Sequence, residues 1–334
     1  MNVTPQAKTI RLRQGSDAWL NFRRSHIGAS DAPVIVGESP YRSPLDLYVE
    51  KIEGPSPVDP DTARLFRIGH ALEPVICGLY TDETGREVRR GRVLESRDFP
   101  WLSASLDAEA EGRIVEAKWT SSARWDNGVP GDVLVQVTHQ MGVSGIPVAD
   151  VAVLTPRGFD VHTVPFDPNF WDKILSLEAD FRERLRLRLP PSPDGSESSR
   201  KALARLFPQD SGEILEADPI ATEIAKDLLE AKATAKSLEG TIGSLENSLR
   251  FLLGEASEMK GPGFTVTYRK AKDSERINWQ GYAESLEGII GEVEARYAGL
   301  LPEGIARIDL DGLRGIYTTT TPGSRRLLVK EAKG

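Results

Sequence analysis

The chain has 334 residues, of which 39% are hydrophobic and 28% are charged, and its formal net charge at pH 7 is −8. These proportions are typical of globular proteins and exclude collagen-like and wholly disordered chains. No apolar run reaches the roughly 18 residues that a membrane-spanning helix needs, and residues 1–13 lack the pattern of a secretory signal. The single cysteine, Cys77, fits a reducing cytoplasm. The negative net charge argues against a protein that coats nucleic acid through bulk positive charge.

Helix and strand patterns alternate over the first 189 residues. Capping residues and apolar periodicity predict helices over 16–24, from 30, and over 43–53, 64–83, 133–144 and 170–189. Pro74 is expected to bend the helix over 64–83 or to start a new one. Strands are predicted over 101–110, 112–119, 148–155 and 161–166. This order predicts an α/β (α+β) fold with a mixed central sheet flanked by helices.

A stretch rich in proline and serine over residues 190–199 lacks apolar periodicity and indicates a linker. We therefore expect one domain over residues 1–189, a linker over 190–217, and a second part over 218–334. The second part is predicted to combine a long helix with a small α+β unit, which has strands at 264–269 and 325–329 and helical structure over 277–290.

The long helix carries a regular apolar seam. Its apolar residues alternate in steps of four and three over four heptads, at Ile224, Leu228, Ala231, Ala235, Leu238, Ile242, Leu245, Leu249 and Leu252. Such a seam is typical of a coiled coil or a helical hairpin. The pattern fits an arm that binds another chain and a helix that packs within its own chain equally well.

Two carboxylates and one ammonium group are expected to converge at the end of a hairpin. Residues two apart on a strand share a face, so Glu116 and Lys118 project together. A turn through Glu111 and Gly112 brings Asp107 beside them on the neighbouring strand. Such carboxylates suit Mg²⁺, which prefers oxygen ligands and can activate a water against a phosphodiester. An exposed hairpin with an ordinary salt bridge is the alternative.

The pattern Glu-x-Lys alone has little specificity, because this chain contains it four times, at 116–118, 230–232, 258–260 and 331–333. Only the first occurrence lies in an apolar strand with an aspartate at the end of the strand before it. The candidate site therefore depends on the combination of Asp107, Glu116 and Lys118.

Five motifs, in order, resemble those of the YqaJ-type viral recombinases, which belong with phage lambda exonuclease to the PD-(D/E)xK nuclease superfamily. They are residues 14–41, Gly69–Pro74, Ala104–Asp107, Glu116–Lys118 and Gln136–Gly145. The resemblance covers roughly residues 12–185. It departs from the family at Val133, where relatives often have tyrosine, at Thr138, where they often have a second glutamine, and at Ala108.

The resemblance implies a PD-(D/E)xK nuclease core and a Mg²⁺-dependent 5′-to-3′ exonuclease that digests one strand of linear duplex DNA, with Mn²⁺ as a possible substitute. Asp107, Glu116 and the backbone carbonyl of Ala117 would hold the metal, with Glu73 adding to the site. Lys118 would orient or activate the attacking water, and Gln136 would support the lysine and the metal ligands.

The resemblance further implies that Arg23, Ser30 and Ser105 bind the terminal 5′-phosphate. An arginine offers a planar fork to phosphate oxygens, and Ser30 stands at an expected helix start, where it could equally be a plain N-cap. Trp19 is expected to be a core residue. A lone Cys77 on an apolar helical stripe is expected to be a core residue too.

The expected partners are double-stranded DNA ends, other copies of the chain and a single-strand annealing protein. The resemblance implies a ring of three or four subunits in the cytoplasm of a bacterial host, encoded by a phage or prophage. Two alternatives remain: a PD-(D/E)xK endonuclease, and a catalytically silent factor that binds DNA ends during recombination. The intact Asp107, Glu116 and Lys118 argue against the silent factor.

Overall fold

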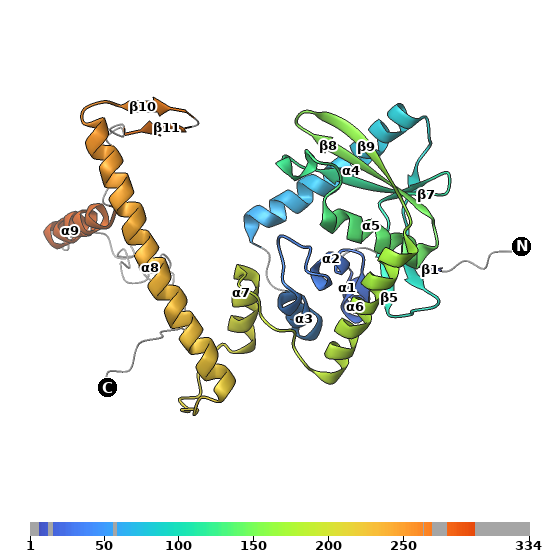
Figure 1. Cartoon of the computed structure of the whole chain (residues 1–334), viewed down its shortest axis with the longest axis horizontal. Coiled ribbons are helices and arrows are strands. Elements are labelled where there is room, and N and C mark those ends of the chain that lie inside the picture. Colours follow the sequence, from blue (N-terminus) through green and yellow to red (C-terminus); the bar gives the residue numbers. More distant parts are fainter. Residues whose placement is uncertain (1–6, 13–15, 56–58, 263, 269–278, 298–334) are drawn as a thin grey trace, which may run out of the picture. The chain divides into compact units, whose positions relative to one another are not determined.

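The computed structural model describes residues 7–12, 16–55, 59–262, 264–268 and 279–297. The chain divides into two compact units, residues 1–210 and 211–334 (Figure 1). Among the described helices, none has the length and apolarity that crossing a membrane requires.

A mixed five-stranded sheet forms the centre of the first unit. Its strand order is β3 (Arg89–Arg90), β6 (Ala108–Ala110), β7 (Arg113–Trp119), β8 (Val148–Thr155) and β9 (Gly158–Pro165). The pair β7–β8 is parallel, because the chain crosses from one to the other through helix α5 (Gly131–Ser144), and the other pairs are antiparallel. The expected fold class, a mixed sheet flanked by helices, is confirmed.

A second, four-stranded sheet has the order β1 (Ala7–Ile10), β4 (Val93–Ser96), β5 (Leu102–Ser105) and β2 (Ile27–Gly28). The single strand expected over 101–110 is therefore wrong: it divides into β5, in this sheet, and β6, in the central sheet. The division leaves Leu106 and Asp107 between two sheets, where Asp107 need not follow the pleat of either.

Helices cover the two faces of the central sheet with separate apolar clusters. Helix α4 (Pro60–Thr84) contributes Ile76 and Tyr80 to a cluster with Val115 and Ala152. The larger cluster includes Ile114 and residues from α5 and α6 (Pro168–Leu187). A buried hydrogen bond also connects α4 to the sheet: the Tyr80 hydroxyl donates over 2.7 Å to Oδ2 of Asp150 on β8.

Two N-terminal helices begin where the sequence predicts them, whereas the helix expected from residue 30 begins two residues later. Helix α1 (Asp17–Ser25) has Ser16 as its N-cap, and α3 (Pro44–Glu53) has Ser43 as its N-cap and ends before Gly54. The short α2 (Ala32–Ile35) starts after Asp31, whose side chain makes no capping bond to it. A short 3₁₀ turn, Ala123–Trp125, follows β7.

Helix α4 runs through Pro74 without a break, so the proline does not start a new helix, which was one of the two outcomes expected for it. A proline inside a helix removes one backbone donor. The loss is tolerated because capping at both ends, by the Asp59 side chain and by Gly85 in the left-handed conformation, and the packing of Ile76 and Tyr80 stabilise the whole element.

The segment expected to be a linker contains a packed helix, α7 (Glu197–Leu206). Ala202 and Ser199 are buried, the Ser43 amide donates to the Ser198 hydroxyl over 3.1 Å, and Arg205 donates to the Gly54 carbonyl over 3.0 Å. The first unit therefore extends to residue 210 rather than ending at 189.

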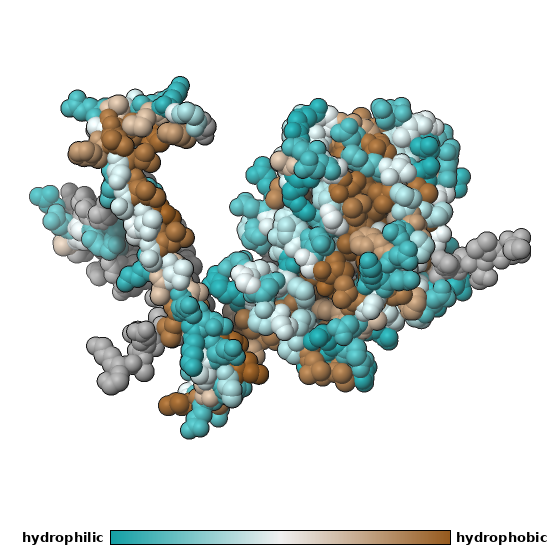
Figure 2. All heavy atoms as spheres, in the orientation of Figure 1, coloured by the Kyte–Doolittle hydropathy of each residue, from teal (hydrophilic) through white to brown (hydrophobic). Residues whose placement is uncertain are grey.

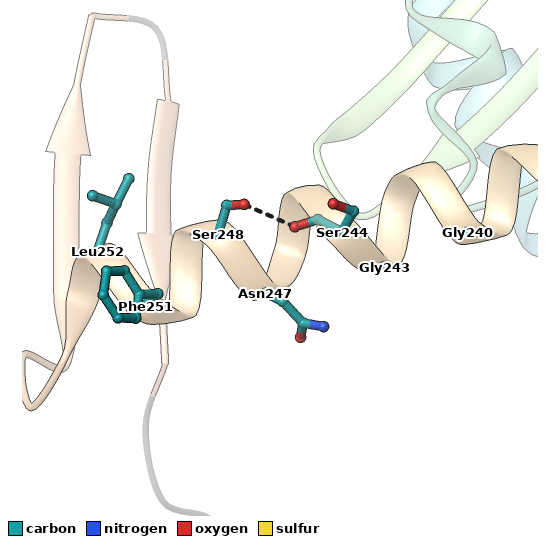
Figure 3. A pocket seen from close by; sticks show the side chains of 7 residues that line it. All are labelled: Gly240, Gly243, Ser244, Asn247, Ser248, Phe251 and Leu252. Carbon is teal, nitrogen blue, oxygen red and sulfur yellow. Dashed lines mark hydrogen bonds between the residues drawn. The ribbon is translucent and has the colours of Figure 1, made fainter.

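The second unit contains α8 (Pro219–Leu253), the hairpin β10 (Glu258–Gly261) and β11 (Phe264–Thr267), and α9 (Trp279–Tyr297). Apolar side chains are exposed along α8 (Figure 2). The exposed residues include Ile224, Leu238, Ile242 and Leu245. Near its C-terminal end, the surface around Ser244, Ser248 and Leu252 forms a shallow hollow (Figure 3). The strand expected at 325–329 lies outside the described residues.

Candidate active site

Strand β7 directs Glu116 and Lys118 to the face of the sheet covered by α5. Val115 and Ala117 pack in the cluster under α4, whereas Ile114 belongs to the cluster that includes α5. Since side chains alternate along a strand, Glu116 and Lys118 share the face of Ile114. Glu116 is 2% exposed, and its Oε1 lies 2.7 Å from the Lys118 Nζ.

Asp107 reaches β7 from the junction between the two sheets. Its Oδ2 accepts a hydrogen bond of 3.0 Å from the backbone amide of Ala117. The structure thus brings Asp107 beside the segment 116–118, as the hairpin pattern predicts. Because the amide of Ala117 lies between Glu116 and Lys118 in the chain, the three side chains belong to one site.

Helix α5 supplies two glutamines that hold Glu116. Gln136 donates from Nε2 to Glu116 Oε1 over 2.7 Å and accepts from Lys118 Nζ over 3.0 Å. Gln140 donates from Nε2 to the other oxygen, Glu116 Oε2, over 2.7 Å and to the Ser105 carbonyl over 3.2 Å. Both carboxylate oxygens of Glu116 are therefore fixed by one turn of the same helix.

Sequence reasoning missed Gln140. The signal was present, because residues four apart share one face of a helix and Gln136 was already a candidate. Thr138, where relatives often have a second glutamine, points elsewhere: its hydroxyl donates to the Leu134 carbonyl within the helix. The second glutamine is thus found one turn after the first.

Burial and the neighbouring carboxylate of Glu116 raise the pKa of Asp107 from 3.8 to about 8. Burial disfavours the charged form of Lys118, but the carboxylate of Glu116 outweighs it and raises the pKa of that ammonium group. The site thus combines a carboxyl group that retains its proton at neutral pH with a lysine that stays charged.

Glu73 lies on α4 and makes a hydrogen bond of 2.8 Å with the Nδ1 atom of His70. Its carboxylate is 38% exposed and is close enough to Asp107 to raise the pKa of that carboxyl group slightly further. Cys77, one turn later on α4, is partly buried against the smaller apolar cluster, as expected.

Asp107 and Glu116 offer carboxylate oxygens to a metal, and the carboxylate of Glu73 lies close enough to Asp107 to affect its pKa. Within the described ranges, no three Asp, Glu, His or Cys side chains gather closely enough to form a metal site by themselves. A pair of carboxylates still suits Mg²⁺, which retains several waters and needs few protein ligands. In addition, the buried Gln140 Oε1 has no hydrogen-bond partner among the described residues, and a bound water would satisfy it. The donor chemistry therefore fits Mg²⁺.

Arg23 and Ser30 lie together at the surface, with the Arg23 Nη2 donating to the Ser30 hydroxyl over 3.5 Å. The turn between them is held by buried Lys51, whose Nζ donates to the Arg23 carbonyl over 2.7 Å and to Asp31 Oδ2 over 2.6 Å. Although burial opposes its ionisation, Asp31 has a lowered pKa because of the Lys51 ammonium group.

Ser105, the third residue expected at the phosphate, is exposed at the end of β5, and its carbonyl binds Gln140. Among the described residues, no hydrogen bond joins its side chain to Arg23 or Ser30. Trp19 is not a core residue: it is half-buried on α1, outside both apolar clusters, with the Arg23 guanidinium 4.9 Å from the centre of its ring.

Residues 18–147 match the sequence model of the YqaJ-like viral recombinase domain. The chain is 27% identical over 252 residues to protein YqaJ of Bacillus subtilis (strain 168). The aligned region covers 72% of this chain and 79% of YqaJ.

Solved structures of two exonucleases are also similar. The alkaline exonuclease LHK-Exo from Laribacter hongkongensis matches with a TM-score of 0.45 and 18% identity, covering 57% of this chain and all of that one. A phage-related exonuclease from Haemophilus somnus 129PT matches with a TM-score of 0.41 and 11% identity, over 49% of this chain and 95% of that one. The match to the sequence model spans the candidate site from Arg23 to Gln140, so these residues lie in the part of the chain that is similar to the YqaJ-like viral recombinase domain.

Proposed function

We propose that this chain is a Mg²⁺-dependent deoxyribonuclease of the PD-(D/E)xK type. It digests the 5′-terminated strand of linear double-stranded DNA in the 5′-to-3′ direction. The product is a 3′ single-stranded overhang, which a single-strand annealing protein uses in homologous recombination of the phage type.

The observation that carries this proposal is the arrangement of charged groups around buried Glu116. An unpaired buried carboxylate is unfavourable, but Lys118, Gln136 and Gln140 hold both oxygens of Glu116 at distances of 2.7 Å. The carboxyl group of Asp107 lies beside it, bonded to the amide of the next residue on β7, Ala117. Such a constellation is unusual for an ordinary surface salt bridge, which exposes both partners. It is suited to a preorganised site for phosphodiester hydrolysis.

The residues of the site take distinct roles in this mechanism. Asp107, Glu116 and the Ala117 carbonyl would hold Mg²⁺, with Glu73 adding a further carboxylate. When bound, the metal supplies Lewis acidity toward a phosphoryl oxygen and lowers the pKa of water. Lys118 orients the attacking water and stabilises the negative charge that develops on the phosphate, and Gln136 fixes the lysine by accepting from its Nζ.

Arg23, Ser30 and Ser105 would bind the 5′-phosphate of the strand being digested. Arg23 and Ser30 present a guanidinium and a hydroxyl side by side at the surface, a pair of donors suited to phosphate oxygens. This would set the length of strand between its terminal phosphate and the bond that is cut.

A ring of three or four copies, enclosing the duplex, is part of this proposal. It reconciles the net charge of −8 with DNA binding, because contact falls on an inner surface while the outer surface stays acidic. The setting is the cytoplasm of a bacterial host, and the gene belongs to a phage or prophage.

Three DNA substrates test the proposal: linear duplex with a 5′-phosphate, the same duplex with a 5′-hydroxyl, and closed circular plasmid, each with Mg²⁺, Mn²⁺ or EDTA. We expect mononucleotides from linear DNA alone, fastest with the 5′-phosphate, and none with EDTA. Labelling one strand at its 5′ or 3′ end gives the direction of digestion.

Each other outcome contradicts a part of the proposal. Nicking or linearisation of the circle indicates an endonuclease. Binding to DNA ends without hydrolysis under any metal indicates a silent end-binding factor. Equal rates with 5′-phosphate and 5′-hydroxyl remove the role assigned to Arg23, Ser30 and Ser105.

A further inference from the structure

A completely buried ion pair lies behind the glutamines that hold Glu116. His139 and Glu178 each have 0% exposed side chains, and the His139 Nδ1 lies 2.6 Å from Glu178 Oε1. The other ring nitrogen, Nε2, lies 3.0 Å from the Ser103 carbonyl oxygen. A carboxylate and a carbonyl are both hydrogen-bond acceptors, so with Glu178 ionised both ring nitrogens donate and His139 is an imidazolium. Although burial opposes the charge, the carboxylate of Glu178 raises the pKa of His139 and favours this charged form.

This pair joins three elements at one point. His139 is on α5, Glu178 is on α6, and the Ser103 carbonyl is on β5. Two residues further along β5, the Ser105 carbonyl accepts from Gln140. Gly142 allows α5 and α6 to pack closely, because it has no side chain where a Cβ would come within 2.5 Å of the Trp171 ring on α6. These contacts fix both the rotation of α5 about its axis and its distance from α6.

The rotation of α5 matters because Gln136 and Gln140 reach Glu116 from the same helix. Both donate over 2.7 Å, a distance that a small rotation would lengthen. Resting on the proposed function, we infer that the His139–Glu178 pair is a positioning device, which holds α5 so that the two glutamines keep the Glu116 carboxylate oriented toward the metal.

A stabilising role alone accounts poorly for this pair. Buried ion pairs are seldom more stabilising than apolar side chains of the same volume, because both charges lose their hydration. Here, in addition, the Oε2 atom of Glu178 is buried with no hydrogen-bond partner among the described residues. The charged pair has a directional effect that an apolar pair lacks: it requires His139 to bond Glu178 and the Ser103 carbonyl simultaneously.

The test compares Glu178→Gln with a matched control, Asp180→Asn, in the full-length chain. The first substitution removes the buried charge and retains the shape of the side chain. The second removes an exposed carboxylate on the same helix, one that pairs with Arg184 over 3.0 Å. Binding of Ca²⁺, used as a non-hydrolysing probe, is measured by calorimetry, and the Mg²⁺ dependence of hydrolysis is measured separately.

We expect Glu178→Gln to weaken Ca²⁺ binding about 10- to 100-fold and to raise the Mg²⁺ concentration for half-maximal hydrolysis in parallel. Asp180→Asn should change neither. If Glu178→Gln lowers thermal stability and leaves metal affinity at the wild-type value, the pair is only structural and the inference is wrong. The calorimetry decides this even if the chain hydrolyses no DNA, so failure of the proposed function is recognised separately.

A second measurement needs no variant. Nitrogen-15 NMR of the histidine rings in the wild-type chain should show both nitrogens of His139 protonated between pH 6 and 8, whereas a neutral ring would show one bare nitrogen. A neutral His139 in this range contradicts the inference, since it could not donate to Glu178 and Ser103 together.

Discussion

Asp107 is a half-buried carboxyl group beside the carboxylate of Glu116, and partial desolvation together with that neighbouring charge raises its pKa to about 8 in the folded protein. In the unfolded chain an aspartate loses its proton near pH 3.9. A raised folded-state pKa contributes stability that is complete below the unfolded value and is lost as the pH rises through the folded value. The metal-free protein should therefore lose stability between about pH 4 and pH 8.

Thermal denaturation in EDTA checks this prediction. The melting temperature of the wild type should fall over this range more steeply than that of Asp107→Asn, which cannot ionise. Added Mg²⁺ should raise the melting temperature more at pH 8.5 than at pH 6, because at the lower pH a proton competes with the cation. Equal pH dependence in the two proteins would mean that Asp107 is already ionised.

Gln140, which the sequence did not point to, should affect both the stability of the protein and its rate of hydrolysis. Gln140→Ala leaves one oxygen of buried Glu116 without its donor, which costs about 1–3 kcal/mol of stability. We expect the hydrolysis rate to fall about 10- to 100-fold as the Glu116 carboxylate loses its fixed orientation. Ser144→Ala, at the far end of α5, should leave the rate unchanged. A Gln140→Ala enzyme with wild-type rate would show that Gln136 suffices.

The sequence predicted that Asp107, Glu116 and Lys118 lie together, but it did not predict the contacts that surround them. Alternation along a strand and a single turn were enough to place Asp107, Glu116 and Lys118 together, because those rules are local. The bonds of Gln140 to Glu116, and of His139 to Glu178, join residues 24 and 39 positions apart. Such pairs depend on how α5 packs on β7 and α6, which no local pattern specifies.

At the scale of helices and strands, local sequence patterns likewise predicted the bounds of some elements and missed others. Strand β8 begins and ends at the residues that its apolar run predicts, and α3 begins and ends at its predicted caps. The division of 101–110 into two strands was not predictable, because both halves have the composition of a strand and only the sheet each joins differs. Helix α7 was missed because proline and serine precede it and only one face of its short length is apolar.

The packing of α7 against α3 gives a test at this scale. Ala202→Asp places a carboxylate at a fully buried position, and we expect the free energy of unfolding of the first unit to fall by at least about 3 kcal/mol. Lys201→Asp, at the exposed neighbouring position, should have little effect. Chemical denaturation measures both. A linker would tolerate either substitution, so equal stability of the two variants would restore the boundary at residue 189.

The apolar seam of α8 concerns the molecule as a whole. Leu238 and Leu245 are 59% and 61% exposed, and a helix with such a seam is stabilised when another helix covers it. If copies of the chain associate through this seam, Leu238→Glu combined with Leu245→Glu should lower the molar mass measured by light scattering. Lys226→Glu with Ala233→Glu, on the opposite side of the heptad, is the matched control. An unchanged mass in the seam variant would exclude self-association through α8.

The central claim is that Asp107, Glu116 and Lys118 form the hydrolytic site, and Lys118→Ala tests it most directly. Release of acid-soluble nucleotides from 5′-phosphorylated linear duplex in Mg²⁺ is measured for the wild type, Lys118→Ala and the exposed-site control Lys173→Ala. We expect Lys118→Ala to lose at least about 10²- to 10³-fold in rate with unchanged molar mass and circular dichroism, and the control to match the wild type. Wild-type release by Lys118→Ala would contradict the account.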